Sequence, residues 1–104
     1  MIPLEKTIEK NIIKFLNLKA GEMLKKPIRA VKWSQSGRQR GNPDIICCID
    51  GKLFLFEVKR PIIGKVTDLQ LFTINLWRES GAICEVVTSV EEVKEILVKS
   101  ILDK

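Results

Sequence analysis

The spacing of apolar and polar residues along the chain predicts three helices and four strands. Apolar side chains recur every three or four residues over 5–18, with lysines between them, which is typical of an amphipathic helix. An Ala-Gly pair at 20–21 is expected to end this helix. Residues 28–33 alternate apolar and basic side chains, which predicts a strand with one solvent-exposed face. The predicted order of elements is α-β-β-β-α-β-α.

A β-hairpin is predicted in the middle of the chain. Two apolar, β-branched runs, 44–49 and 52–58, are joined by Asp50-Gly51, a dipeptide suited to a two-residue type I′ turn. The two runs are therefore expected to pair antiparallel. Both faces of both runs are apolar, which predicts a sheet that is covered on both sides near its centre.

Two later helices carry signals for their N-termini. Thr67 is a candidate N-cap for a helix over 68–79, and Gln70 stands in the capping-box position. Ser89 caps the last helix, after a further apolar run that predicts a strand. Since no internal repeat or linker interrupts the pattern, residues 1–104 are expected to form one domain of mixed α/β class.

Charge and residue usage narrow the possible chemistry. The 104 residues include 18 Lys and Arg, 13 Asp and Glu, and no His, for a formal charge of +5. Residues 1–65 hold 14 basic and 6 acidic side chains, whereas residues 66–104 hold 4 and 7. A basic surplus attracts polyanions such as nucleic acids, although it also serves as a solubilising surface. Without His, an enzyme would need carboxylates, lysine or a hard metal.

Two further classes of protein are disfavoured by the sequence. The three Cys lack the spacing of a thiolate zinc site or a disulfide framework. No apolar run approaches the ~20 residues needed to span a bilayer. The protein is therefore expected in the cytoplasm and not in a membrane.

Charged residues gather at one end of the predicted hairpin. Asp44 follows Pro43 at the start of the first strand, and Glu57 and Lys59 end the second strand on one face. Two carboxylates form a hard-oxygen site suited to Mg²⁺, with the Val58 carbonyl as a further ligand. Such a metal can activate a water molecule to attack a phosphodiester, while Lys59 positions this nucleophile or offsets the charge that develops. The alternative is an ordinary surface ion pair between Glu57 and Lys59, but the added Pro-Asp at hairpin spacing favours the metal site.

Supporting residues have more than one interpretation. Gln70 either completes a capping box or reaches Lys59 or a catalytic water. Glu5 projects toward the apolar face of the first helix, where it would ligate the metal or a metal-bound water, or pair with a buried lysine. Glu9, farther from that direction, is the alternative first-helix acid. Four basic residues flank the cluster and suit phosphate contact: Lys32, Arg38, Arg40 and Arg60.

These motifs together resemble the viral-type replication-repair nuclease (VRR-Nuc) domain of the PD-(D/E)xK nuclease superfamily. The matching segments occur in the same order along nearly the whole chain: 5–10, 32–33, 36–38, 41–44, 56–61, 69–70, 81 and 86–89. The resemblance implies a restriction-endonuclease-like core in which Asp44, Glu57 and the Val58 carbonyl bind Mg²⁺ or Mn²⁺. It further implies that Lys59 is the catalytic lysine, that Gln70 supports the site, and that Glu5 is the first-helix acid.

The resemblance also implies a function. Small members of this family act as homodimers that cut branched DNA such as four-way junctions. We therefore expect a metal-dependent, structure-specific DNA endonuclease that acts as a homodimeric Holliday-junction resolvase. It is expected in the cytoplasm, and one possible origin is a phage whose protein acts in a bacterial host. The alternatives are a less selective nicking or single-strand nuclease of the same fold, a non-catalytic nucleic-acid-binding protein, and an interaction module without a nucleic-acid role.

Overall fold

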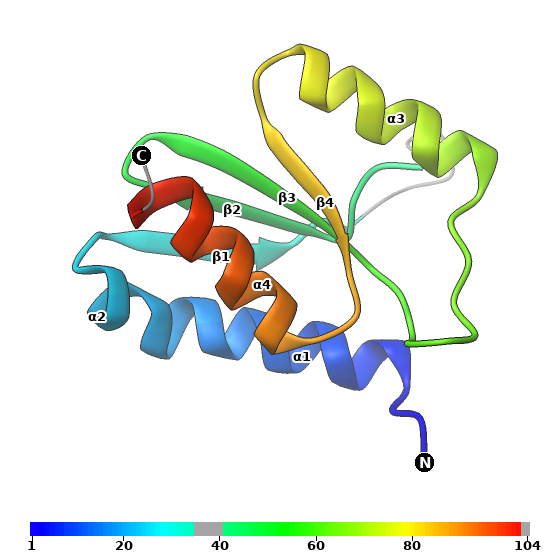
Figure 1. The fold of residues 1–104 in the computed structure, drawn as a ribbon, viewed down its shortest axis with the longest axis horizontal. Coiled ribbons are helices and arrows are strands. Elements are labelled where there is room, and N and C mark those ends of the chain that lie inside the picture. The colour runs from blue at the N-terminus through cyan, green and yellow to red at the C-terminus, as the bar shows by residue number, and fades with distance from the viewer. Residues whose placement is uncertain (35–40, 103–104) are drawn as a thin grey trace.

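Four strands form one mixed sheet in the computed structural model, which describes residues 1–34 and 41–102 (Figure 1). The strands are β1 (Ile28–Lys32), β2 (Ile45–Ile49), β3 (Lys52–Val58) and β4 (Ile83–Val87), in the spatial order β1-β2-β3-β4. β1, β2 and β3 pair antiparallel, whereas β4 runs parallel to β3. A parallel neighbour requires a crossover connection, and one helix supplies it between β3 and β4. The predicted order of elements is confirmed.

The hairpin turn has the predicted geometry. Asp50 and Gly51 have φ angles of 49° and 83°, and a type I′ turn requires positive φ at both positions. A Cβ added at Gly51 would contact nothing within 4 Å, so glycine suits this position because of its positive φ and not because of close packing. The turn sets a register in which Ile45 faces Phe56, and this register decides which residues meet at the far end of the hairpin.

The first helix runs farther than its apolar pattern predicts. The helical segments are α1 (Glu5–Phe15), a π-helical turn (Leu16–Ala20), α2 (Gly21–Leu24), α3 (Asp68–Glu79), α4 (Val90–Leu97) and a second π-helical turn (Val98–Leu102). The expectation that the helix ends at Ala20-Gly21 is wrong, because Gly21 itself has helical backbone angles. Burial of Leu24 in the main core outweighs the ~1 kcal/mol that a glycine costs inside a helix. The helix ends at Lys25, whose φ of 56° lies in the left-handed region.

Both predicted N-caps are present. The Thr67 side chain accepts a hydrogen bond from the Gln70 backbone, and the Gln70 side chain accepts one from the Thr67 backbone, which completes the capping box of α3. At the start of α4, the Ser89 hydroxyl accepts a hydrogen bond from the backbone N–H of Glu92. These local bonds begin the two helices at the predicted residues.

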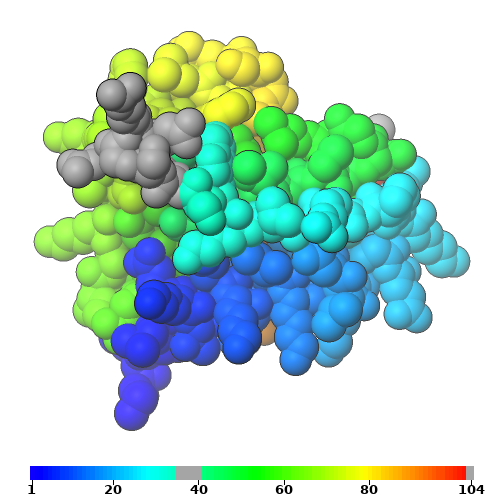
Figure 2. Space-filling model, turned by 180° about the vertical axis from the view of Figure 1, so that it is seen from behind, coloured from blue at the N-terminus to red at the C-terminus, as the bar shows by residue number. Residues whose placement is uncertain are grey.

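Helices cover the two faces of the sheet unequally. α1, α2 and α4 pack on one face, where the main core includes fully buried Ile12 and Phe56. α1 lies along β1 on the side of the molecule seen in Figure 2. α3 packs on the other face over a smaller cluster of Leu55, Ile74 and Cys84. The sheet is covered on both sides near its centre, as expected, but Cys48 of β2 is exposed, since α3 reaches only part of this face.

No helix within the described ranges is both long and apolar enough to cross a membrane.

Candidate active site

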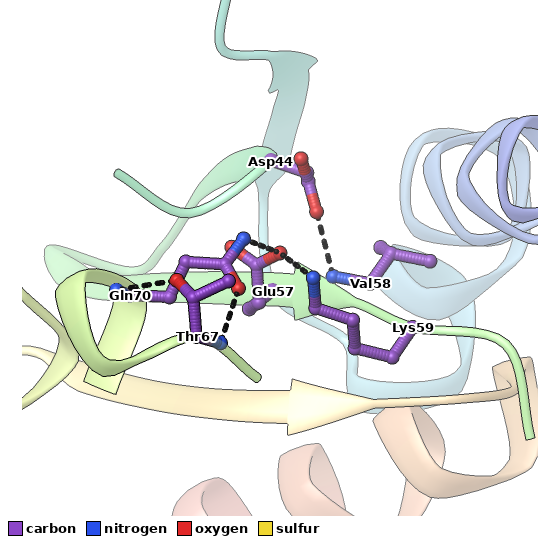
Figure 3. Close-up of polar contacts among 6 residues, drawn as sticks. All are labelled: Asp44, Glu57, Val58, Lys59, Thr67 and Gln70. Atoms are coloured by element: carbon purple, nitrogen blue, oxygen red, sulfur yellow. Dashed lines mark hydrogen bonds and ion pairs between the residues drawn. The ribbon is translucent and has the colours of Figure 1, made fainter. Parts of the chain in front are cut away.

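The hairpin register brings the two predicted carboxylates together. Asp44 directly precedes Ile45, Glu57 directly follows Phe56, and Ile45 and Phe56 are paired. The Asp44 backbone N–H donates to the Phe56 carbonyl at 3.0 Å, which carries the pairing of β2 and β3 one residue further. Figure 3 shows both carboxylates at this end of the hairpin, with Lys59 and Gln70 beside Glu57. The predicted convergence at the sheet edge is therefore observed.

Asp44 is held in place by the backbone of the neighbouring strand. The Val58 backbone N–H donates to Asp44 Oδ2 at 2.8 Å. Val58 is fully buried, so a backbone N–H at this position needs a partner. The side chain of Asp44 thus takes the place of a strand partner, and this bond fixes where its carboxylate stands.

Glu57 is a buried carboxylate with incomplete hydrogen bonding. It is 1% exposed. Its Oε2 accepts a hydrogen bond from Gln70 Nε2 at 3.0 Å and lies 3.4 Å from Lys59 Nζ. Among the described residues, its Oε1 is a buried side-chain oxygen without a hydrogen-bond partner. Burial first, and then the negative charge of Asp44, raise the pKa of Glu57 to about 8, although Lys59 acts in the opposite direction.

This carboxylate pair fits a divalent cation. It is costly to bury an ionised carboxylate with an unpartnered oxygen beside a second carboxylate. A bound cation would offset both the cost of burying the charge and the repulsion between the two carboxylates. Within the described residues, no group of three or more acidic, His or Cys side chains is placed to hold a metal. A two-carboxylate set suits Mg²⁺, which typically takes one or two protein carboxylates and completes its shell with waters and phosphate oxygens.

Lys59 is held beside the carboxylates by the parallel strand. Its backbone N–H donates to the Val87 carbonyl of β4 at 3.0 Å. Its side chain is 13% exposed, so the ammonium faces Glu57 and not bulk water. The site thus contains one buried ammonium at a sheet position that both β3 and β4 determine.

Gln70 completes the predicted capping box and also reaches the site, where its partner is Glu57 and not the predicted Lys59. Its Oε1 accepts the Thr67 backbone N–H at 3.0 Å as part of the capping box. Its Nε2 donates to Glu57 Oε2 at 3.0 Å from the same amide group. The cap therefore orients the amide whose other end holds the catalytic candidate Glu57.

Glu9 is the more deeply buried of the two first-helix acids, and its charge interacts with that of Asp44. Glu9 is 9% exposed, and its Oε1 lies 3.4 Å from Lys32 Nζ. Burial raises the pKa of Glu9, Lys32 opposes this, and the charge of Asp44 adds to the increase. Glu5 is half-buried. The mean direction of the apolar face pointed to Glu5, but α1 packs with Ile8, Glu9 and Ile12 inward.

The predicted phosphate-contacting residues are placed differently from one another. Lys32 lies at the end of β1 and is exposed. Arg60 donates from Nε to the Pro3 carbonyl and from Nη2 to the Ile2 carbonyl, both at 2.9 Å, so its guanidinium ties down the N-terminal segment. Arg38 and Arg40 lie outside the described residues.

Two solved structures are similar to this chain. One, named "VRR_NUC domain", has a TM-score of 0.67 and 26% sequence identity, and the match covers 89% of this chain and 92% of that one. The other, named "VRR_NUC domain protein", has a TM-score of 0.74 and 16% identity, with coverage of 98% and 91%. No protein-family model and no curated protein sequence matches the chain. The chain therefore has the fold of structures named for a VRR_NUC domain, with the mixed four-stranded sheet of the PD-(D/E)xK type.

Proposed function

We propose that this protein is a metal-dependent DNA endonuclease that hydrolyses phosphodiester bonds in branched DNA as a homodimer, in the manner of a Holliday-junction resolvase. The observation that carries the proposal is the buried, unpartnered oxygen of Glu57 beside Asp44. The similarity to structures named for a VRR-Nuc domain supports a hydrolytic nuclease. The basic surplus in residues 1–65 supports a phosphate-rich substrate.

Asp44 and Glu57 would hold Mg²⁺ or Mn²⁺, with the Val58 carbonyl as a further ligand. When bound, the ion supplies Lewis-acid polarisation of a phosphodiester oxygen and lowers the pKa of a coordinated water. Lys59 holds its ammonium 3.4 Å from Glu57 Oε2, where it offsets negative charge that develops on the phosphate. Gln70 keeps Glu57 in orientation, and Glu9 is the proposed first-helix acid that orients a water at the site.

An exposed apolar surface supports the homodimer. Phe72 lies at the centre of the outward side of α3 and is 62% exposed. Other large apolar side chains are exposed along α3 and the segment that leads to it: Ile62, Ile63, Val66, Leu69, Leu71 and Leu76. Each of the seven side chains exposes more than a third of its surface. Exposed apolar side chains gathered in this way are typical of an interaction surface, and two copies would bury it through a two-fold contact.

Substrate selectivity tests the proposed reaction. We expect a four-way junction to be cut at least ~10-fold faster than linear duplex, flap or single-stranded DNA in Mg²⁺, and not at all with chelator. The rates are measured on end-labelled DNA of matched sequence. Equal rates on all substrates would instead indicate a less selective nuclease, and binding without cutting would indicate a non-catalytic DNA-binding protein.

Substitution at the centre of the α3 surface tests the dimer. Phe72→Glu is expected to convert the dimer to a monomer, with a dimer Kd at least ~30-fold higher, because a central apolar anchor contributes about 2 kcal/mol or more. Sedimentation of wild type and variant at equal concentration measures the change. Leu18→Glu is the matched control, since Leu18 is 65% exposed on the π-helical turn, away from α3. A monomeric wild type, or a variant that dimerises as tightly as wild type, contradicts this part of the proposal.

A further inference from the structure

A surface cavity of about 370 Å³ lies between α1 and β1. Four of its lining residues come from α1, namely Lys6, Glu9, Lys10 and Ile13, and Lys32 comes from β1. α1 and β1 lie side by side on the face shown in Figure 2. Three of the five lining side chains are therefore lysines.

The charges around this cavity do not cancel. Glu9 is paired with Lys32 at 3.4 Å, which neutralises one lysine. Lys6 and Lys10 are exposed, and the side chain of neither forms an ion pair or hydrogen bond within the described part of the chain. They stand four residues apart on one side of α1, where two like charges destabilise a helix unless an anion lies between them. The cavity is thus suited to an anion.

The cavity adjoins the carboxylate pair. Lys32 is paired with Ile45, the residue that follows Asp44. The backbone N–H of Trp33 donates to the Asp44 carbonyl at 2.8 Å. Glu9, on the cavity wall, is within electrostatic reach of Asp44. A strand of DNA whose phosphate reaches Asp44 and Glu57 can therefore extend over this cavity.

We propose that Lys6, Lys10 and Lys32 form a subsite for a backbone phosphate of the DNA strand, next to the phosphodiester that is hydrolysed. The inference rests on the proposed function for the nature of the strand. Ammonium groups contact phosphate irrespective of base, so this subsite positions the strand and reads no sequence. Lys6 and Lys10 are positioning residues, because they contact a phosphate that does not react.

Salt-dependent binding tests the subsite. The double variant Lys6→Gln/Lys10→Gln is compared with wild type for binding to a four-way junction in Ca²⁺, over a series of salt concentrations. We expect the Kd to rise ~10-fold or more at 0.1 M salt, and the slope of log K against log salt to fall in magnitude by about 1 to 2. Single-turnover cleavage in Mg²⁺ at saturating protein is expected to stay within threefold of wild type, since the reacting groups are unchanged.

Two further variants make the test specific. Lys94→Gln/Lys99→Gln removes the same charge from another surface cavity, on the C-terminal helical segment, and is expected to keep the wild-type slope. Lys6→Arg/Lys10→Arg keeps the charge and is expected to restore the slope. If the Gln variant at 6 and 10 keeps the wild-type slope, or if the control at 94 and 99 loses as much, the subsite is rejected. Wild-type protein that binds junctions with the predicted salt slope but cuts no DNA would reject the nuclease and leave the subsite standing.

Discussion

Replacing Glu57 by glutamine is expected to lower the rate of DNA cleavage about 10³-fold, which corresponds to roughly 4 kcal/mol of transition-state stabilisation. Glutamine keeps the volume of the side chain and an oxygen that can accept from Gln70 Nε2, but it lacks the charge that would bind a divalent cation. The rate is measured by single-turnover cleavage of a junction in saturating Mg²⁺. The folded structure should survive, because the charged form of Glu57 is itself disfavoured by burial.

A matched substitution separates this effect from a general loss of charge. Glu95→Gln makes the same chemical change at an exposed position of α4 and is expected to cleave at the wild-type rate. Asp44→Asn is expected to match Glu57→Gln, since its amide oxygen can still accept from the Val58 N–H. The double variant should lose little more than either single variant, because both carboxylates act on one ion. Cleavage by Glu57→Gln within tenfold of wild type would exclude the assigned role.

Without metal, the protein is expected to become less stable as pH rises from about 5.5 to 8.5. The pKa of Glu57 is about 8 in the folded protein and lies near its ordinary value of 4.5 in the unfolded chain, so the folded state binds more protons between these values. The contribution of the protonated Glu57 carboxyl to the free energy of unfolding is fully present below pH 4.5 and is lost as pH rises toward 8. Each pKa unit of difference corresponds to about 1.4 kcal/mol. A loss of 1 kcal/mol lowers the Tm of a domain of this size by roughly 4–8 °C, so we expect a fall of at least ~5 °C.

Thermal unfolding in chelator and in excess Mg²⁺ measures this dependence. Mg²⁺ should raise the Tm more at pH 8.5 than at pH 5.5, because it binds the ionised carboxylates. Glu57→Gln should flatten the pH dependence in chelator, and the slope that remains is assigned to Glu9, whose pKa is raised in the same direction. Burial raises the pKa of Cys47 to about 12 and that of Cys84 to about 11, so the two thiols add to the loss of stability only from about pH 9, their ordinary pKa, upward. A Tm that rises with pH in the metal-free wild type would contradict the assignment.

The parts of the fold that the sequence predicted well depend on neighbouring residues. Asp50-Gly51 specifies a turn through its own backbone angles, and that turn aligns Asp44 with Glu57 because register propagates along a hairpin. The capping box of Thr67 and Gln70 likewise forms within one helical turn. Where packing at a distance competed with such local signals, the prediction was wrong, as at Gly21, where the helix continues and Leu24 is buried in the main core.

The sequence by itself determined the chemistry available to this protein. It holds no His, and it places two carboxylates and a lysine at the open end of one hairpin. Only the tertiary structure decided that Glu9 is buried more deeply than Glu5, that Gln70 serves helix and carboxylate together, and that Arg60 binds the N-terminal segment. The physical reason is that side-chain type and strand register follow from short stretches of chain. The burial of a side chain and the partners of its hydrogen bonds and ion pairs depend on how α1, α3 and the N-terminal segment pack around the sheet.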